Sequence, residues 1–130
     1  CTLPISAASW TYALATVRAW NASSNARWQF VSGLSEDGVS FFVSSAGGPN
    51  AANVAMNYGA SLDTTTSFTG GRFNISVNTA SWYPGGGLAD AIGAQLGYHY
   101  VSLVEASAGG GTSTTIGGRA YSYGAMTWRC

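Results

Sequence analysis

The sequence predicts an all-β fold, an antiparallel β-sandwich or barrel of the jelly-roll or Greek-key type with about seven or eight strands and one short helix. Three observations support this prediction. Hydrophobic and polar residues alternate over several short segments, aromatic and β-branched residues are concentrated in those segments, and Gly and Ser clusters separate them. An alternation of period two places one face of each strand in the core and the other face in water.

The individual strands follow from this alternation. Three apolar residues from Phe73 to Val77 alternate with polar ones, which predicts a strand at residues 72–78. Residues 10–20 carry large side chains at every second position and are predicted to form one long strand. Further strands are expected at residues 27–34, 39–44, 53–58, 65–69, 98–106 and 119–128.

One segment departs from the alternation and predicts the helix. After a run of three glycines, Leu88, Ile92 and Leu96 recur at a spacing of four residues. This spacing, with Asp90 in the first turn, is typical of a short helix of about two turns. We expect this helix to close one end of the fold.

The positions of the cysteines predict how the domain is closed. The chain of 130 residues suits one domain, and its two cysteines are Cys1 and Cys130. We predict that residues 1–130 form a single β domain closed by a terminal disulfide, worth about 5 kcal/mol in the chain-entropy model. Two alternatives are a lipidated Cys1 and disulfides to neighbouring subunits. The disulfide requires an oxidising compartment, which predicts an extracellular, secreted or virion-surface location.

The beginning of the chain and its acceptor patterns agree with this location. Because the chain starts at Cys1 without a basic region followed by an apolar one, we expect a processed product whose targeting segment has been removed. Two segments match the N-glycosylation pattern, beginning at Asn21 and Asn74. Both are predicted glycosylation sites, and Asn74 falls on the polar face of the strand predicted at residues 72–78.

Charge is sparse and restricts the partners. Only 8% of the residues are charged, the formal net charge is zero, and the basic residues are five arginines. So little positive charge gives no basis for binding nucleic acid, and no apolar run has the length of a membrane span. Low net charge also removes the repulsion between copies. We therefore expect a homo-oligomer, such as a trimer or a larger assembly.

The residues that catalysis requires are few. The chain has one histidine and five carboxylates. His99 lies between Tyr98 and Tyr100 in a predicted strand, where a structural hydrogen bond is more common than general-base chemistry. The acidic residues do not show a metal-binding spacing. We expect no catalytic residues, no metal and no cofactor, and therefore a protein that is not an enzyme.

Aromatic residues beside a Gly-rich turn are the remaining candidates for function. Trp82 and Tyr83 directly precede the turn and Asp90 follows it, and we predict these three as binding residues. Aromatic side chains on loops commonly stack on sugar rings or anchor a protein partner. The predicted function is a recognition module, such as a fibre or spike head or a lectin-like domain, that binds a glycan or protein receptor. One alternative is a self-assembling structural subunit of a coat, decoration layer or filament, and another is a small secreted hydrolase.

Overall fold

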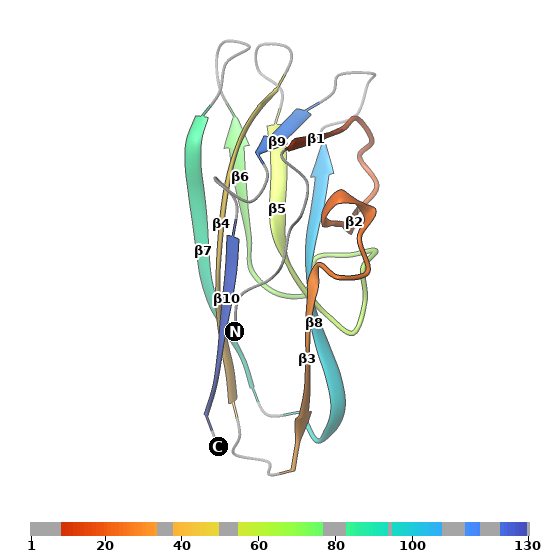
Figure 1. Ribbon diagram of the computed structural model, residues 1–130, viewed down its shortest axis with the longest axis vertical. Helices are drawn as coiled ribbons and strands as arrows, with labels where there is room; N and C mark the ends of the chain where they lie inside the picture. The colour runs from red at the N-terminus through yellow and green to blue at the C-terminus, as the bar shows by residue number, and fades with distance from the viewer. Residues whose placement is uncertain are drawn as a thin grey trace.

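The structure, a computed structural model, consists of two antiparallel five-stranded sheets that enclose a shared core (Figure 1). The predicted all-β antiparallel architecture is therefore confirmed. Cys1 and Cys130 lie outside the described residues, so the terminal disulfide stays a prediction. The structure describes residues 9–33, 38–49, 55–76, 83–93, 95–107, 114–117 and 123–129.

The first sheet is organised around β4 (Gly38–Pro49), its longest strand. β7 (Tyr83–Ile92) pairs along one edge of β4. β10 (Tyr123–Arg129) and β9 (Thr114–Gly117) follow one another along the other edge. β1 (Ser9–Tyr12) pairs with β9 and extends the sheet beyond it.

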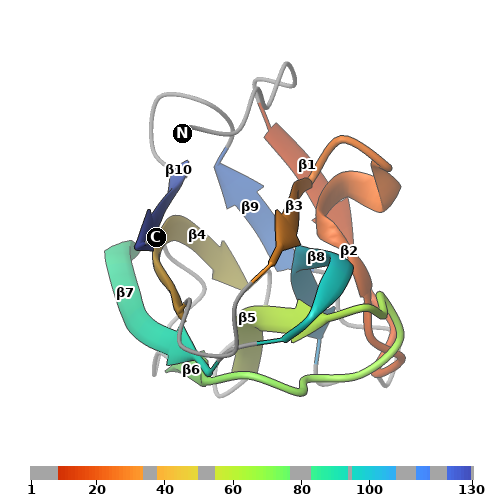
Figure 2. The ribbon, with the colours of Figure 1, turned by 90° about the horizontal axis from the view of Figure 1, so that it is seen from below.

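The second sheet is organised around β8 (Gly97–Ser107). β5 (Ala55–Leu62) pairs along one edge of β8, and β6 (Arg72–Ser76) pairs with the far side of β5. β3 (Arg27–Ser32) and the short β2 (Arg18–Ala19) share the other edge of β8. The view from below shows β4, β7 and β10 on one side of the molecule and β3 and β8 on the other (Figure 2).

The core between the sheets follows the predicted alternation in β3, whereas in β8 the residues from Val101 to Ser107 are all buried. In β3, Trp28 and Phe30 are buried and the residues between and beside them are exposed or partly exposed. Tyr58 packs edge-on against Trp20 at a centroid distance of 6.1 Å and lies 5.2 Å from the Phe73 ring, within the range of favourable aromatic pairs. The buried hydrophobic cluster consists of Trp10, Trp20, Ala26, Trp28, Phe30, Val39, Phe41, Val43, Met56, Tyr58, Ala60, Val101 and Leu103.

The predicted helix after the Gly-rich turn is wrong, because this segment belongs to β7. Residues four apart share a face in a strand as well as in a helix, so the spacing of Leu88 and Ile92 does not separate the two. Leu88 pairs with Val43 and Ile92 with Val39, and the hydrogen bonds of the β4 edge therefore decide the conformation. Among the described residues the helical element is the 3-10 turn η1 (Trp20–Ala22), and none of them form a helix that could span a membrane.

The predicted long strand at residues 10–20 is divided between the two sheets. β1 belongs to the first sheet and β2 to the second, and residues 13–17 cross from one sheet to the other. Trp10 and Trp20 nevertheless both point into the core, with ring centroids 6.1 Å apart. The alternation thus placed Trp10 and Trp20 correctly in the core, but Leu14, on the same predicted face, is 59% exposed. The pattern also did not indicate that the chain changes sheets. Residues 65–69, also predicted as a strand, form part of the connection from β5 to β6.

Gly59 marks a close approach between β5 and the loop before β6. A Cβ atom at Gly59 would lie 2.6 Å from the carbonyl oxygen of Gly71 and 2.8 Å from the Phe68 ring, whereas one at Gly33 would have no atom within 4 Å. We predict that Gly59→Ala lowers the free energy of unfolding by about 1–3 kcal/mol, while Gly33→Ala changes it by less than about 0.5 kcal/mol. Urea unfolding measures both variants, and equal stabilities would contradict the packing of this loop.

Candidate functional site

The structure describes one of the three predicted binding residues in full. Trp82 lies outside the described residues, and of Tyr83 only the backbone is described, at the start of β7. The Asp90 carboxylate accepts hydrogen bonds from the backbone N–H of Gly71 at 2.6 Å and of Ala91 at 2.8 Å. Asp90 therefore ties β7 of the first sheet to the segment that enters β6 of the second. Its predicted role in binding stays a prediction.

Both predicted glycosylation sites are exposed. Asn21 lies in η1 with a left-handed backbone (φ 52°), and Asn74 lies on β6. The Asn74 side-chain amide donates a hydrogen bond to Oδ1 of Asn57 at 3.0 Å. Exposure is a requirement for an attached sugar, and glycosylation itself stays a prediction.

His99 is held by hydrogen bonds at both ring nitrogens. Nδ1 lies 2.6 Å from Oδ2 of Asp63 and Nε2 lies 2.9 Å from the Leu96 carbonyl oxygen, while the Tyr100 N–H donates to Oδ1 of Asp63 at 3.0 Å. The hydrogen bond to Asp63, assisted by the Leu96 carbonyl, raises the pKa of His99 above its ordinary value of 6.5. In this arrangement both nitrogens are engaged, which leaves neither to accept a proton from a substrate. The described residues also contain no group of three or more His, Cys, Asp or Glu side chains placed to hold a metal ion.

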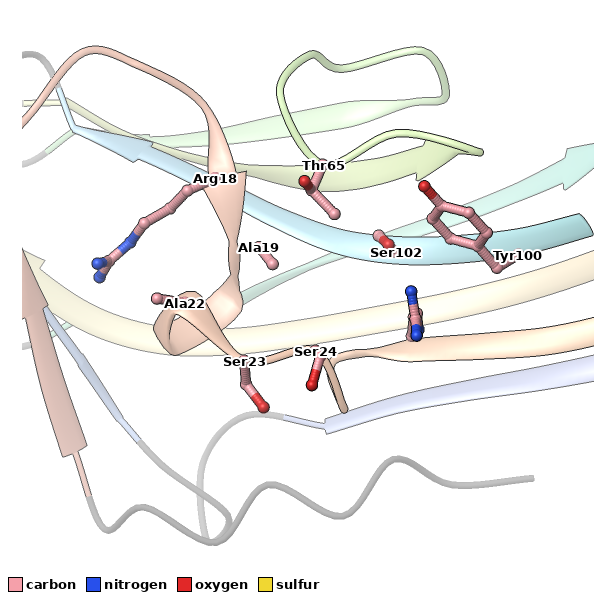
Figure 3. A pocket seen from close by; sticks show the side chains of 9 residues that line it. Arg18, Ala19, Ala22, Ser23, Ser24, Thr65, Tyr100 and Ser102 are labelled. Carbon is pink, nitrogen blue, oxygen red and sulfur yellow. The ribbon is translucent and has the colours of Figure 1, made fainter.

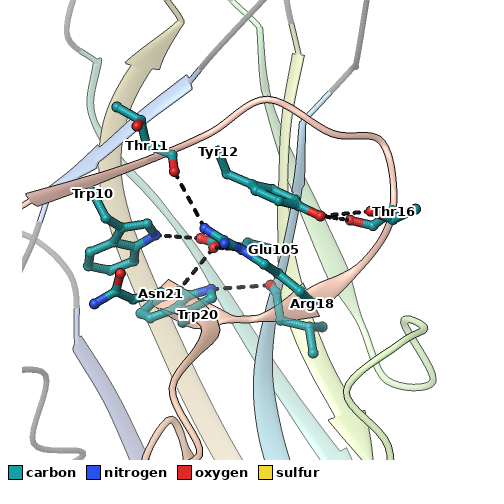
Figure 4. A network of polar contacts seen from close by, with 9 residues as sticks. Trp10, Thr11, Tyr12, Thr16, Arg18, Trp20, Asn21 and Glu105 are labelled. Atoms are coloured by element: carbon teal, nitrogen blue, oxygen red, sulfur yellow. Dashed lines mark hydrogen bonds and ion pairs between the residues drawn. The ribbon is translucent and has the colours of Figure 1, made fainter. Parts of the chain in front are cut away.

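Glu105 is the centre of a buried polar network (Figure 4). Its carboxylate accepts hydrogen bonds from Nε1 of Trp10 at 2.7 Å, Nε of Arg18 at 2.8 Å and the backbone N–H of Asn21 at 3.2 Å. Burial raises the pKa of Glu105, and the hydrogen bonds and the Arg18 charge oppose this rise. The Arg18 guanidinium also lies 3.8 Å from the centre of the Tyr12 ring. Each member of the network thus has protein partners, which indicates a structural role.

An open groove lies beside this network, over the outer face of β8 (Figure 3). Its floor includes Tyr100 and Ser102, one side is formed by the segment from β2 through η1 to the start of β3, and Thr65 lies on the opposite side. The groove measures about 440 Å³, which is within the range of small-molecule sites. It is lined by Arg18, Ala19, Ala22, Ser23, Ser24, Arg27, Thr65, Tyr100 and Ser102.

The local strand pattern explains why the groove is open. β2 ends after two residues and β3 starts only at Arg27, so the edge of β8 between them is covered by a turn. A hydrogen bond from the Leu103 N–H to the Ala26 carbonyl, 2.8 Å long, keeps this turn against β8. The turn presents small side chains, which leave space over the strand.

Arg27 and Ser102 have unsatisfied polar atoms in this groove. The two residues are register partners on β3 and β8. Nε of Arg27 and Oγ of Ser102 are buried and have no hydrogen-bond partner. The Arg27 guanidinium lies 5.2 Å from the centre of the Tyr100 ring, and no described carboxylate pairs with it. Arg18, on the same groove, is paired with Glu105.

Sequence reasoning did not find this groove. Arg27 and Tyr100 both occupy the exposed face of their predicted strands, and this placement could have indicated a site on the surface. That they meet depends on the pairing of β3 with β8, and period-two alternation does not specify strand partners. Comparison with models of known protein families, with characterised proteins and with solved structures found no match to the chain.

Removing the Glu105 carboxylate should destabilise the fold strongly. Glu105→Ala leaves Nε1 of Trp10 buried without an acceptor and Arg18 without its counter-charge. We predict a loss of about 3 kcal/mol in the free energy of unfolding. Glu105→Gln keeps an acceptor oxygen and should lose less. Denaturant unfolding of both variants measures this, and a loss below about 1 kcal/mol for Glu105→Ala would show that the network is dispensable.

The pair of His99 and Asp63 should make stability depend on pH. Because the pKa of His99 is raised above 6.5 in the folded state, its stabilising contribution is complete below pH 6.5 and is lost as the pH rises through the folded-state pKa. We predict that the free energy of unfolding falls over this interval and that His99→Gln flattens the fall. His99 is the chain's one histidine, so its NMR titration reports the value directly. A pKa at or below 6.5 would contradict the pair.

Proposed function

We propose that the domain is a non-enzymatic recognition module that binds a glycan through the groove over β8. The observation that carries this proposal is the combination of a half-buried aromatic ring, Tyr100, with hydroxyl and guanidinium groups in one groove. A sugar ring offers an apolar face for an aromatic side chain and hydroxyl groups that both donate and accept hydrogen bonds. Ser23, Ser24 and Thr65 supply matching hydroxyl groups.

The lining of the groove supports binding in preference to catalysis. The residues that line it include no His, Cys, Asp or Glu, so none of these side chains lines the groove as a general base that could activate its serine or threonine hydroxyl groups as nucleophiles. Arginine is a poor general base because it stays protonated. This composition favours a module that holds its ligand without changing it.

The same proposal includes an oxidising location. A disulfide between Cys1 and Cys130, and sugars on Asn21 and Asn74, would all require passage through a secretory compartment. We propose an extracellular, secreted or virion-surface protein on these grounds. Its ligand would then be a glycan of a receptor or of a surface.

A second proposal is self-association through the edge of β3. β3 pairs with β8, and no other described strand pairs with it. Val31 on this strand has an exposed fraction of 59%. Such an edge, with few charges to protect it, is a template for pairing with another chain. A homo-oligomer, or a coat or filament subunit, would cover it.

The proposed site predicts that Tyr100 contributes to glycan affinity. With a ligand identified on a glycan array, we expect Tyr100→Ala to weaken binding about five- to tenfold, because the stacking surface is lost. Tyr98→Ala is the matched control, since Tyr98 lies on the same strand and is exposed but does not line the groove. Titration calorimetry measures both variants.

The same measurement on Trp82→Ala compares the groove with the loop predicted from the sequence. Loss of affinity in Trp82→Ala but not in Tyr100→Ala would move the site to that loop. Absence of any saturable glycan binding would overturn the proposed function.

A further inference from the structure

We infer that the glycan is acidic and that its carboxylate or sulfate group binds Arg27. This inference rests on the proposed function and specifies its ligand class. It follows from three features of the groove, namely an unbalanced charge, an unsatisfied buried donor and an adjacent aromatic ring.

The charge of Arg27 is unbalanced because the described carboxylates bind other groups. Glu105 binds Arg18, Asp63 binds His99, and Asp90 accepts two backbone N–H groups. Among the described residues none of these carboxylates lines the groove. Arg27 therefore contributes a positive charge to the groove that the described residues do not neutralise.

The environment of Arg27 makes an anion its favourable partner. Its Nε is buried without a hydrogen-bond acceptor, and burial of an unpaired polar or charged group is costly. An oxyanion supplies acceptors to a guanidinium group in the forked geometry that matches it. The Arg27 guanidinium lies over the Tyr100 ring, 5.2 Å from its centre, so the two groups are adjacent and one ligand can contact both.

The number of arginines without a carboxylate partner in the groove distinguishes between an acidic sugar and a polyanion as the ligand. Arg18 and Arg27 are the cationic residues that line the groove, and Arg18 already has Glu105 as its partner. Nucleic acid binding relies on several cationic side chains that contact successive phosphates. One available arginine beside an aromatic ring and hydroxyl groups fits a single acidic group on an otherwise neutral saccharide.

The experiment compares three oligosaccharides of equal length: one neutral, one bearing a uronic acid carboxylate and one bearing a sulfate. The protein is produced in a bacterial periplasm, which permits the disulfide without adding sugar to Asn21 beside the groove. We expect the acidic oligosaccharides to bind at least about tenfold more tightly than the neutral one. The tighter of the two acidic ligands identifies the group that the site prefers.

Two arginine variants test the residue itself. Arg27→Gln should reduce the affinity for the acidic oligosaccharide to that for the neutral one and leave the latter unchanged. Arg72→Gln is the matched control, because Arg72 is an exposed arginine on β6 and does not line the groove. It removes the same charge and should leave both affinities unchanged.

A measurement without mutation covers the case in which Arg27→Gln does not fold. Raising the salt concentration should weaken binding of the acidic oligosaccharide to the native protein and not of the neutral one. Equal affinities for acidic and neutral ligands, or affinities unaffected by both salt and Arg27→Gln, would overturn the inference and leave the proposed function standing. Binding of none of the three oligosaccharides, together with an unresponsive glycan array, would overturn the proposed function itself.

Discussion

The buried carboxylate of Glu105 is the constraint on which the rest of this end of the molecule depends. It projects from β8 of the second sheet and binds Trp10 of the first, and it also holds Arg18 and the backbone of Asn21. The segment that crosses between the sheets is therefore fixed at both ends. Because this segment continues into the turn that borders the groove, the shape of the candidate site follows from the same network.

The few acidic residues that the structure describes have structural roles in this arrangement. In most domains acidic residues cover the surface and balance nearby cations. Here the described acidic side chains each connect separate parts of the chain: Glu105 joins the two sheets, Asp90 joins β7 to the entry of β6, and Asp63 joins the end of β5 to β8. Arg27, which lines the groove, lies outside these contacts, so no described carboxylate neutralises its charge.

The sequence predicted the positions of several strands, which local patterns determine. It did not predict the features that depend on which strands pair with one another. Alternation located the strands that became β3, β6 and β8 and indicated which face of β3 is buried, whereas in β8 every residue from Val101 to Ser107 is buried. It failed at Leu88 and Ile92, because a spacing of four residues fits a strand and a helix equally, and the open edge of β4 selected the strand. Alternation could not predict the groove, because Thr65, Arg27 and Tyr100 come together only through the strand pairing around β8.

The shape of the groove relates the two proposals, glycan recognition and self-association. An open groove would bury only part of a bound saccharide, and the surface left in water contributes nothing to affinity, so a single site of the proposed kind would bind weakly. The edge of β3 and the exposed Val31 favour association of several copies. Several weak sites held on one assembly bind a surface that displays many copies of a glycan with an avidity far above that of one site. The proposed self-association would therefore supply the valency that the proposed glycan recognition requires.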